Sequence, residues 1–213
     1  MLTEPPATVE NGAVLSQQPA VEVRDADGDL LVGVDVTASI ASGDGELSGT
    51  TTDSTDDAGR AVFADLSISG AVGAYTIRFE AGSASAVSRA IALGAGPAAT
   101  LTILTPPSSA TPSGASFAQQ PVVEVEDMSG NPVSNVTVTA SIASGDGELS
   151  GTTTDSTDDA GRAVFADLSI SGAVGAYTIR FEAGSASAVS RAIALGAGPA
   201  ATLTILTPPS SAT

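Results

Sequence analysis

The sequence predicts an all-β protein that contains two tandem β-sandwiches, and three observations support this prediction. The chain of 213 residues repeats itself with a period of 102 residues, the offset of Val138 from Val36. Within each period, short segments of alternating apolar and polar residues are separated by turn residues. No segment carries a helical period with caps at its ends.

The repeat defines the domain organisation. Residues 36–111 recur unchanged as residues 138–213, whereas the preceding 34 pairs, from Leu2 and Leu104 onward, are identical at 14 positions. A period of this length is too long for a solenoid unit and fits one sandwich per repeat. We therefore expect a first repeat in residues 1–95 that lacks its own first strand, and a second in residues 96–197. Residues 198–213 then form a spare first strand, which is donated to the next subunit or starts a third repeat.

Strand signals are strong inside one period. Residues 34–40 alternate between an apolar face that begins with Val34 and a polar face that begins with Asp35, and residues 75–79 alternate in the same way. Further strands are expected at residues 20–24, 60–68, 87–93 and 100–104. Asp-Gly and Gly-Asp-Gly turns lie between them. The count is about seven strands per repeat, the number of an immunoglobulin-like sandwich.

Composition excludes several classes of function. The 24 carboxylates and seven Arg give a net charge of −17, which repels phosphate backbones and anionic membrane surfaces. We therefore expect that the protein neither binds nucleic acid nor inserts into a membrane. The chain has no His, Cys or Lys, so the usual nucleophile and base constellations cannot be assembled. We expect no enzyme activity, no catalytic residue and no cofactor. Met1 is not followed by a signal peptide, so an export signal would lie outside this chain.

Three motifs resemble the bacterial immunoglobulin-like repeats of the invasin and intimin type. The first is Asp127-Met128-Ser129-Gly130-Asn131-Pro132-Val133, which stands in the first copy as Asp25-Ala26-Asp27-Gly28-Asp29-Leu30 and so departs from the pattern. The second is the Thr- and Asp-rich turn at residues 155–165, which leads to Gly-Arg-Ala-Val-Phe. The third is Gly-Ala-Tyr at Tyr75 and Tyr177. The resemblance implies a rigid extracellular spacer and identifies no ligand.

Four kinds of site residue are candidates. Asp25, Asp27 and Asp29 supply oxygen atoms at alternate positions, as calcium loops do, although an Asp-Gly hairpin turn explains the same residues and is preferred. Asn135 begins a glycosylation sequon, Asn135-Val136-Thr137. Tyr75 and Tyr177 are typical of a tyrosine corner, in which the buried hydroxyl is bonded to backbone. An assembly strand is expected around Ala201, Leu203 and Ile205.

The leading functional hypothesis is a structural segment of an extracellular fibre at the cell surface. Residues 96–104 recur as residues 198–206, so one end of the chain carries a second copy of the strand that the first repeat lacks. Donation of that strand to the next molecule would give a head-to-tail homopolymer. The alternative is the stalk or a ligand-binding module of a bacterial adhesin, whose receptor or glycan the sequence does not identify.

Overall fold

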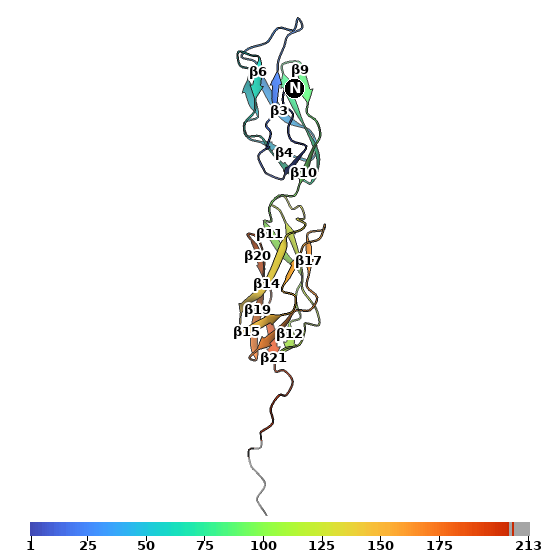
Figure 1. The fold of residues 1–213 in the computed structure, drawn as a ribbon, viewed down its shortest axis with the longest axis vertical. Helices are drawn as coiled ribbons and strands as arrows, with labels where there is room; N and C mark the ends of the chain where they lie inside the picture. Colours follow the sequence, from blue (N-terminus) through green and yellow to red (C-terminus); the bar gives the residue numbers. More distant parts are fainter. Residues whose placement is uncertain (205, 207–213) are drawn as a thin grey trace, which may run out of the picture. The chain divides into compact units, whose positions relative to one another are not determined.

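The structure, a computed structural model, describes residues 1–204 and 206. These residues form β-strands and no helix (Figure 1). The strands of the first repeat are β1 (Thr8–Glu10), β2 (Ala20–Glu22), β3 (Asp35–Ser42), β4 (Gly45–Ser48), β5 (Thr52–Ser54), β6 (Arg60–Val62), β7 (Ser67–Gly70), β8 (Gly73–Ala81), β9 (Ala84–Val87) and β10 (Ile91–Gly94). Those of the second are β11 (Thr100–Thr105), β12 (Ala110–Pro112), β13 (Val122–Glu126), β14 (Thr137–Ser144), β15 (Gly147–Ser150), β16 (Thr154–Ser156), β17 (Arg162–Val164), β18 (Ser169–Gly172), β19 (Gly175–Ala183), β20 (Ala186–Val189) and β21 (Ile193–Gly196).

The large sheet has the same topology in both repeats, which confirms the prediction of two tandem immunoglobulin-like sandwiches. In the first, one sheet has the order β1-β10-β8-β3-β5, with β9 also paired to β8. The remaining strands form the pairs β2-β6 and β4-β7. In the second, the order β12-β21-β19-β14-β16 repeats the large sheet, and β13 is paired on one side with β17 and on the other with β11.

The alternation expected from the sequence places one face of each central strand in the core. Val36 and Ala38 of β3 are buried, as are Tyr75, Ile77 and Phe79 of β8. The rings of Phe63 and Phe79 pack at a centroid distance of 5.2 Å, and those of Phe165 and Phe181 at 5.3 Å. These pairs supply the aromatic part of cores that otherwise consist of Ile, Leu, Val and Ala.

Two of the predicted strands are each divided in the structure. Residues 60–68 divide into β6 and β7 because the Gln18 side chain takes the place of a strand partner at Leu66. Its Oε1 accepts from Leu66 N at 3.1 Å and its Nε2 donates to Leu66 O at 3.1 Å. Residues 87–93 divide into β9 and β10 at Ser88, whose Oγ accepts the Ile77 amide at 2.9 Å. In both cases a side chain satisfies backbone groups that a continuous strand would have paired.

The tyrosine corner is present in both repeats. The Tyr75 ring is buried, and its hydroxyl lies 2.8 Å from the carbonyl oxygens of Asp44 and Ala71. Burial, and after it the negative charge of Asp44, raises the pKa of Tyr75. Gly43 lies against the ring with φ +108°, and a Cβ atom there would stand 2.3 Å from Tyr75 Cδ1. The Gly-Asp-Gly turn is therefore shaped by the ring that it covers.

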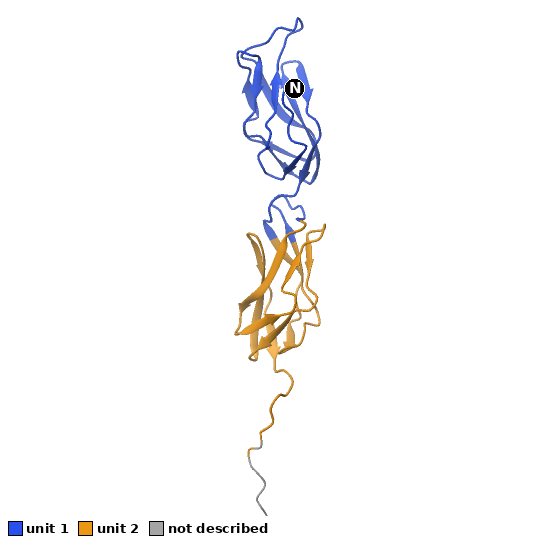
Figure 2. Ribbon diagram, viewed as in Figure 1, with its two compact units in different colours: residues 1–100, 125–133 blue, residues 101–124, 134–213 orange. Residues whose placement is uncertain are grey.

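The chain forms two compact units that do not coincide with the sequence period. Unit 1 contains residues 1–100 together with 125–133, and unit 2 contains residues 101–124 and 134–213 (Figure 2). The turn that carries Asp127 and Asn131 therefore belongs to unit 1, although its sequence lies in the second repeat. The predicted boundaries at residues 95 and 197 follow the sequence period and remain a prediction.

Replacement of Gly43 by alanine tests the turn around the tyrosine corner. We expect Gly43→Ala to lower the free energy of unfolding by about 2–4 kcal/mol, because the new methyl group collides with the Tyr75 ring and φ is unfavourable. Gly82→Ala is the matched control: its φ is +60° but no atom lies within 4 Å, so the cost is about 1 kcal/mol. Urea unfolding followed by circular dichroism measures both. Equal effects would contradict the steric account.

Candidate functional site

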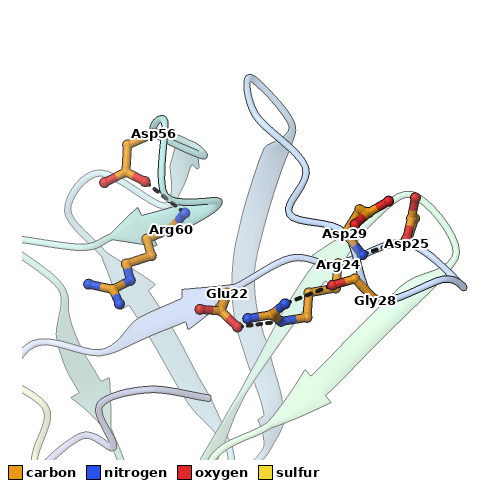
Figure 3. A network of polar contacts seen from close by, with 7 residues as sticks. All are labelled: Glu22, Arg24, Asp25, Gly28, Asp29, Asp56 and Arg60. Atoms are coloured by element: carbon orange, nitrogen blue, oxygen red, sulfur yellow. Dashed lines mark hydrogen bonds and ion pairs between the residues drawn. The ribbon is translucent and has the colours of Figure 1, made fainter.

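The three predicted calcium ligands lie in an exposed turn of the first repeat. Figure 3 shows two of them, Asp25 and Asp29. Asp25 Oδ1 accepts from the amides of Asp27 at 3.0 Å and Asp29 at 2.9 Å. Gly28 has φ +90° and donates its amide to Asp25 O at 3.2 Å. Arg24 supports the turn from outside, because its guanidinium donates to Gly28 O and pairs with Glu22. The Asp-Gly turn that the sequence favours is thus present.

The described residues contain no cluster of three or more His, Cys, Asp or Glu side chains that could hold a metal ion. One oxygen of Asp25 is already occupied by two amides of its own turn. Calcium binding by Asp25, Asp27 and Asp29 stays a prediction. The neighbouring Asp-rich turn works in the same way: Asp56 Oδ1 accepts the amides of Ala58 and Arg60, and Asp53 Oδ2 accepts that of Val62.

The equivalent turn of the second repeat, residues 127–131, has the same internal bonds but is buried. Asp127 Oδ1 accepts the amides of Ser129 at 2.8 Å and Asn131 at 2.9 Å. Asp127 is 4% exposed and Asn131 is 7% exposed, whereas Asp25 and Asp29 are exposed. The same local turn therefore stands in two environments.

The second carboxylate oxygen of Asp127 accepts hydrogen bonds from residues that cover the turn. Asp127 Oδ2 accepts from Asn11 Nδ2 at 2.9 Å, from Gly96 N at 2.9 Å and from Asn131 Nδ2 at 3.0 Å. All four residues belong to unit 1. The carboxylate thus receives hydrogen bonds on both oxygen atoms, which is the arrangement that makes a buried charge tolerable.

Asn11 and Asn131 complete this site by bridging to the strand end at Gly70. Asn11 Nδ2 donates to Gly70 O at 2.9 Å, and Gly70 N donates back to Asn11 Oδ1 at 3.1 Å. Asn131 Nδ2 also donates to Gly70 O at 2.9 Å, while its Oδ1 accepts from Val72 N at 3.0 Å. Each amide side chain uses both a donor and an acceptor, so the Asn residues cannot be replaced by Asp without loss.

These bonds decide the charge state of Asp127. Burial raises its pKa, but the hydrogen bonds from Gly96, Asn131 and Asn11 favour the charged form and together lower the pKa from 3.8 to about 2. The carboxylate is therefore ionised at all physiological pH values, and the net effect of its surroundings is stabilising.

A second candidate site is a groove of about 190 Å³ beside β2 in the first repeat. One wall is formed by β2 and the two residues after it, and the other mainly by the hairpin of β8 and β9. The lining residues are Val21, Glu22, Val23, Arg24, Val36, Phe79, Ala81, Ala84, Ser85 and Ala86. In the second repeat, β11 is paired with the strand that corresponds to β2, and Leu101 of β11 is buried.

The two copies of the groove differ in exposure although nine of the ten lining residues are identical, Arg24 against Glu126 being the exception. Ala84 is exposed, whereas its counterpart Ala186 is 3% exposed. Val23 is 8% exposed, whereas Val125 is fully buried. In the first repeat β2 is paired with β6, and besides β6 only Thr3 makes a bridge to β2, at Ala20, among the described residues. The groove is therefore the place that β11 fills in the second repeat.

The residues expected to form an assembly strand are partly described. Ala201 and Leu203 lie outside the strands, both are exposed, and Leu203 is 92% exposed. Ile205 lies outside the described residues. Asn135 of the candidate sequon is exposed and has φ 58°. The structure does not bring Asn135 or the calcium candidates together with the assembly residues in any described contact.

Sequence reasoning missed Asn11 and the role of Asn131. Asn11 stands in the diverged part of the repeat, where Ser113 is its counterpart, so the repeat did not mark it. The Asp-x-x-Gly-Asn motif was visible, but its sequence indicates only a turn. The difference between Asp29 and Asn131 was the available signal, because only the amide can donate a hydrogen bond.

Replacement of Asp127 tests its buried hydrogen bonds. We expect Asp127→Asn to lower the free energy of unfolding at neutral pH by about 2–3 kcal/mol, because an amide NH₂ would face the donors of Asn11 and Gly96. Asp25→Asn is the matched control, since Asn still caps the exposed turn, and we expect a change within about 0.5 kcal/mol. Chemical unfolding of both variants checks this; equal losses would contradict the assignment.

The pH dependence follows from the same site. The pKa of Asp127 is lower in the folded than in the unfolded chain, so the unfolded chain binds the proton more readily and stability rises with pH. The contribution is complete above 3.8 and is lost as the pH falls through about 2. Thermal unfolding of the wild type and Asp127→Asn should therefore converge in acid. A difference that stays constant down to this range would refute the pKa assignment.

Comparison with known proteins finds similar structures but no similar sequence. No known family and no curated protein matches the chain. The structure of the Escherichia coli adhesin FdeC is 16% identical with a TM-score of 0.50, over 91% of this chain and 62% of that one. The D0-D1 domain of intimin is 16% identical with a TM-score of 0.35, over 91% of this chain and 95% of that one. Domains 5-6 of the S-layer protein SbsC are 19% identical with a TM-score of 0.29, over 89% and 92%. The likeness to FdeC shows the fold: this chain is built from immunoglobulin-like sandwiches of the kind that occurs in a bacterial adhesin.

Proposed function

We propose that this chain is a non-enzymatic structural segment of an extracellular bacterial surface fibre or adhesin stalk. Its fold occurs in the adhesin FdeC, and near-identical tandem repeats suit a spacer better than a recognition module with one distinctive set of loops. The described residues hold no acidic, His or Cys cluster suited to a metal ion and no helix that is long and apolar enough to cross a membrane. We expect no hydrolase activity.

The groove beside β2 supports a specific mode of assembly. We expect it to take the 198–204 segment of a second copy of the chain. That segment repeats residues 96–102, which include the buried Leu101. In the second repeat, the Ala99 amide donates to Glu126 O at 2.9 Å. By the same register, Ala201 would donate to Arg24 O of the recipient copy, and Leu203 would enter the groove.

The energetic reason is the open strand edge. An unpaired edge exposes amide and carbonyl groups that readily add another strand. Burial of one leucine side chain contributes about 1.5–3 kcal/mol, and the Leu203 side chain is now almost fully exposed. Addition of a strand to each copy by the next is a head-to-tail contact that does not close, so it gives a filament. In a covalent stalk, the same groove would be filled by a preceding repeat.

Assembly through Leu203 can be measured by sedimentation velocity and negative-stain microscopy. We expect Leu203→Glu, and deletion of residues 198–213, to abolish filaments and to leave both repeats folded by circular dichroism. Thr202→Glu is the matched control, because its counterpart Thr100 is exposed in β11 and its side chain should face solvent. Filaments that survive the deletion, or a wild-type chain that stays monomeric at high concentration, would refute donation between copies.

A further inference from the structure

The end of unit 2 repeats the surface that holds the 127–131 turn in unit 1. We propose that this end, formed by Ser113, Gly172 and Gly198, docks the 25–29 turn of a second copy. We also propose that Ser113 and Asp29 make this contact weaker than the corresponding contact inside unit 1. The inference rests on the proposed head-to-tail assembly and identifies the residues that set its strength.

The backbones of the two ends agree bond for bond. Asn11 N donates to Gly94 O at 3.0 Å, and Ser113 N donates to Gly196 O at 2.9 Å. In the same way, the amide of Gly12 donates to Ile68 O at 2.9 Å and that of Gly114 to Ile170 O at 2.8 Å. Each unit therefore presents the same loop.

Exposure distinguishes the occupied end from the free one. In unit 1, Gly96 is buried and Gly70 is half-buried beneath the 127–131 turn. Their counterparts in unit 2, Gly198 and Gly172, have identical surrounding sequence and are exposed. Val72 is 53% exposed and Val174 is 71% exposed, which follows the same trend. The free end thus lacks the cover that a turn of this type provides in unit 1.

The 25–29 turn has the conformation that this surface accepts. Asp25 N donates to Asp29 O at 3.0 Å and Asp127 N to Asn131 O at 2.9 Å, and each Asp caps its own turn with Oδ1. No described residue donates to Asp25 Oδ2, the atom that corresponds to the one on Asp127 that accepts from Gly96. The Gly198 amide can take the place of the Gly96 amide.

Two substitutions remove hydrogen-bond donors from this contact. Ser113 Oγ already donates its single hydrogen to Gly172 O at 3.1 Å, so it cannot also reach a carboxylate as Asn11 does. Asp29 replaces Asn131 and has no hydrogen for Gly172 O, which corresponds to the Gly70 O that Asn131 contacts. Asp29 also places a second negative charge beside Asp25. The contact between copies is therefore weaker than the one inside unit 1.

The test restores the two donors in the full chain. We expect Ser113→Asn and Asp29→Asn each to raise the association constant between copies about tenfold, and the double variant about a hundredfold, in sedimentation equilibrium. Asp57→Asn is the control for net charge, because Asp57 is exposed and lies outside the turn. It should change association less than threefold, roughly the effect of a surface charge.

Four outcomes separate this inference from the proposed function. Stronger association of the double variant supports the docking surface. Association that Leu203→Glu abolishes but that the two Asn substitutions leave unchanged overturns the docking surface and retains strand donation. Strengthening by the double variant that persists with Leu203→Glu supports docking and overturns strand donation. Absence of association in the wild type and all variants overturns both.

Discussion

The need to cover the edge of one strand, β2 in the first repeat and β13 in the second, is the constraint that governs this structure. The chain has no Cys and therefore no disulfide to protect the edges of its sheets, so pairing with another strand is the means of covering them. In the second repeat β11 performs this task for β13, and the residues beneath it are buried. In the first repeat the same residues line a groove. Comparison of the two repeats thus shows how far one added strand buries the residues beneath it.

A carboxylate performs the corresponding task at the end of the sandwich. Asp127 first closes its own turn and then binds the amide of Gly96 and the side chain of Asn11, so one residue connects local geometry with a long-range contact. The cost of burying its charge is offset by donors on both oxygen atoms. Asp25 keeps the local function and has no described long-range partner.

The fold class and the central strands could be predicted from sequence, because alternation and turn residues act over short distances, whereas the short strands β1, β4 and β5 were not predicted. The period located both sandwiches, and the tyrosine corner that was predicted at Tyr75 is present. Strand breaks at Leu66 and Ser88 were missed, because they depend on side chains far away in sequence or across a sheet. The bonds from Asn11 to Asp127 span 116 positions and carry no local signal.

The exact duplication has a consequence for how the chain acquires its structure. Strands β3 and β14 contain the same residues from Val36 and Val138 onward, and β8 and β19 are identical. Strand β8 could therefore pair with β14 in the same register as with β3, and β19 with β3 as with β14. Correct pairing is therefore selected by the connection within each repeat, residues 43–72 in the first, which is shorter than any connection between repeats, and by the order of synthesis, rather than by complementarity. The diverged residues 2–35 and 104–137 are the part of each repeat that can still distinguish its own partner during folding.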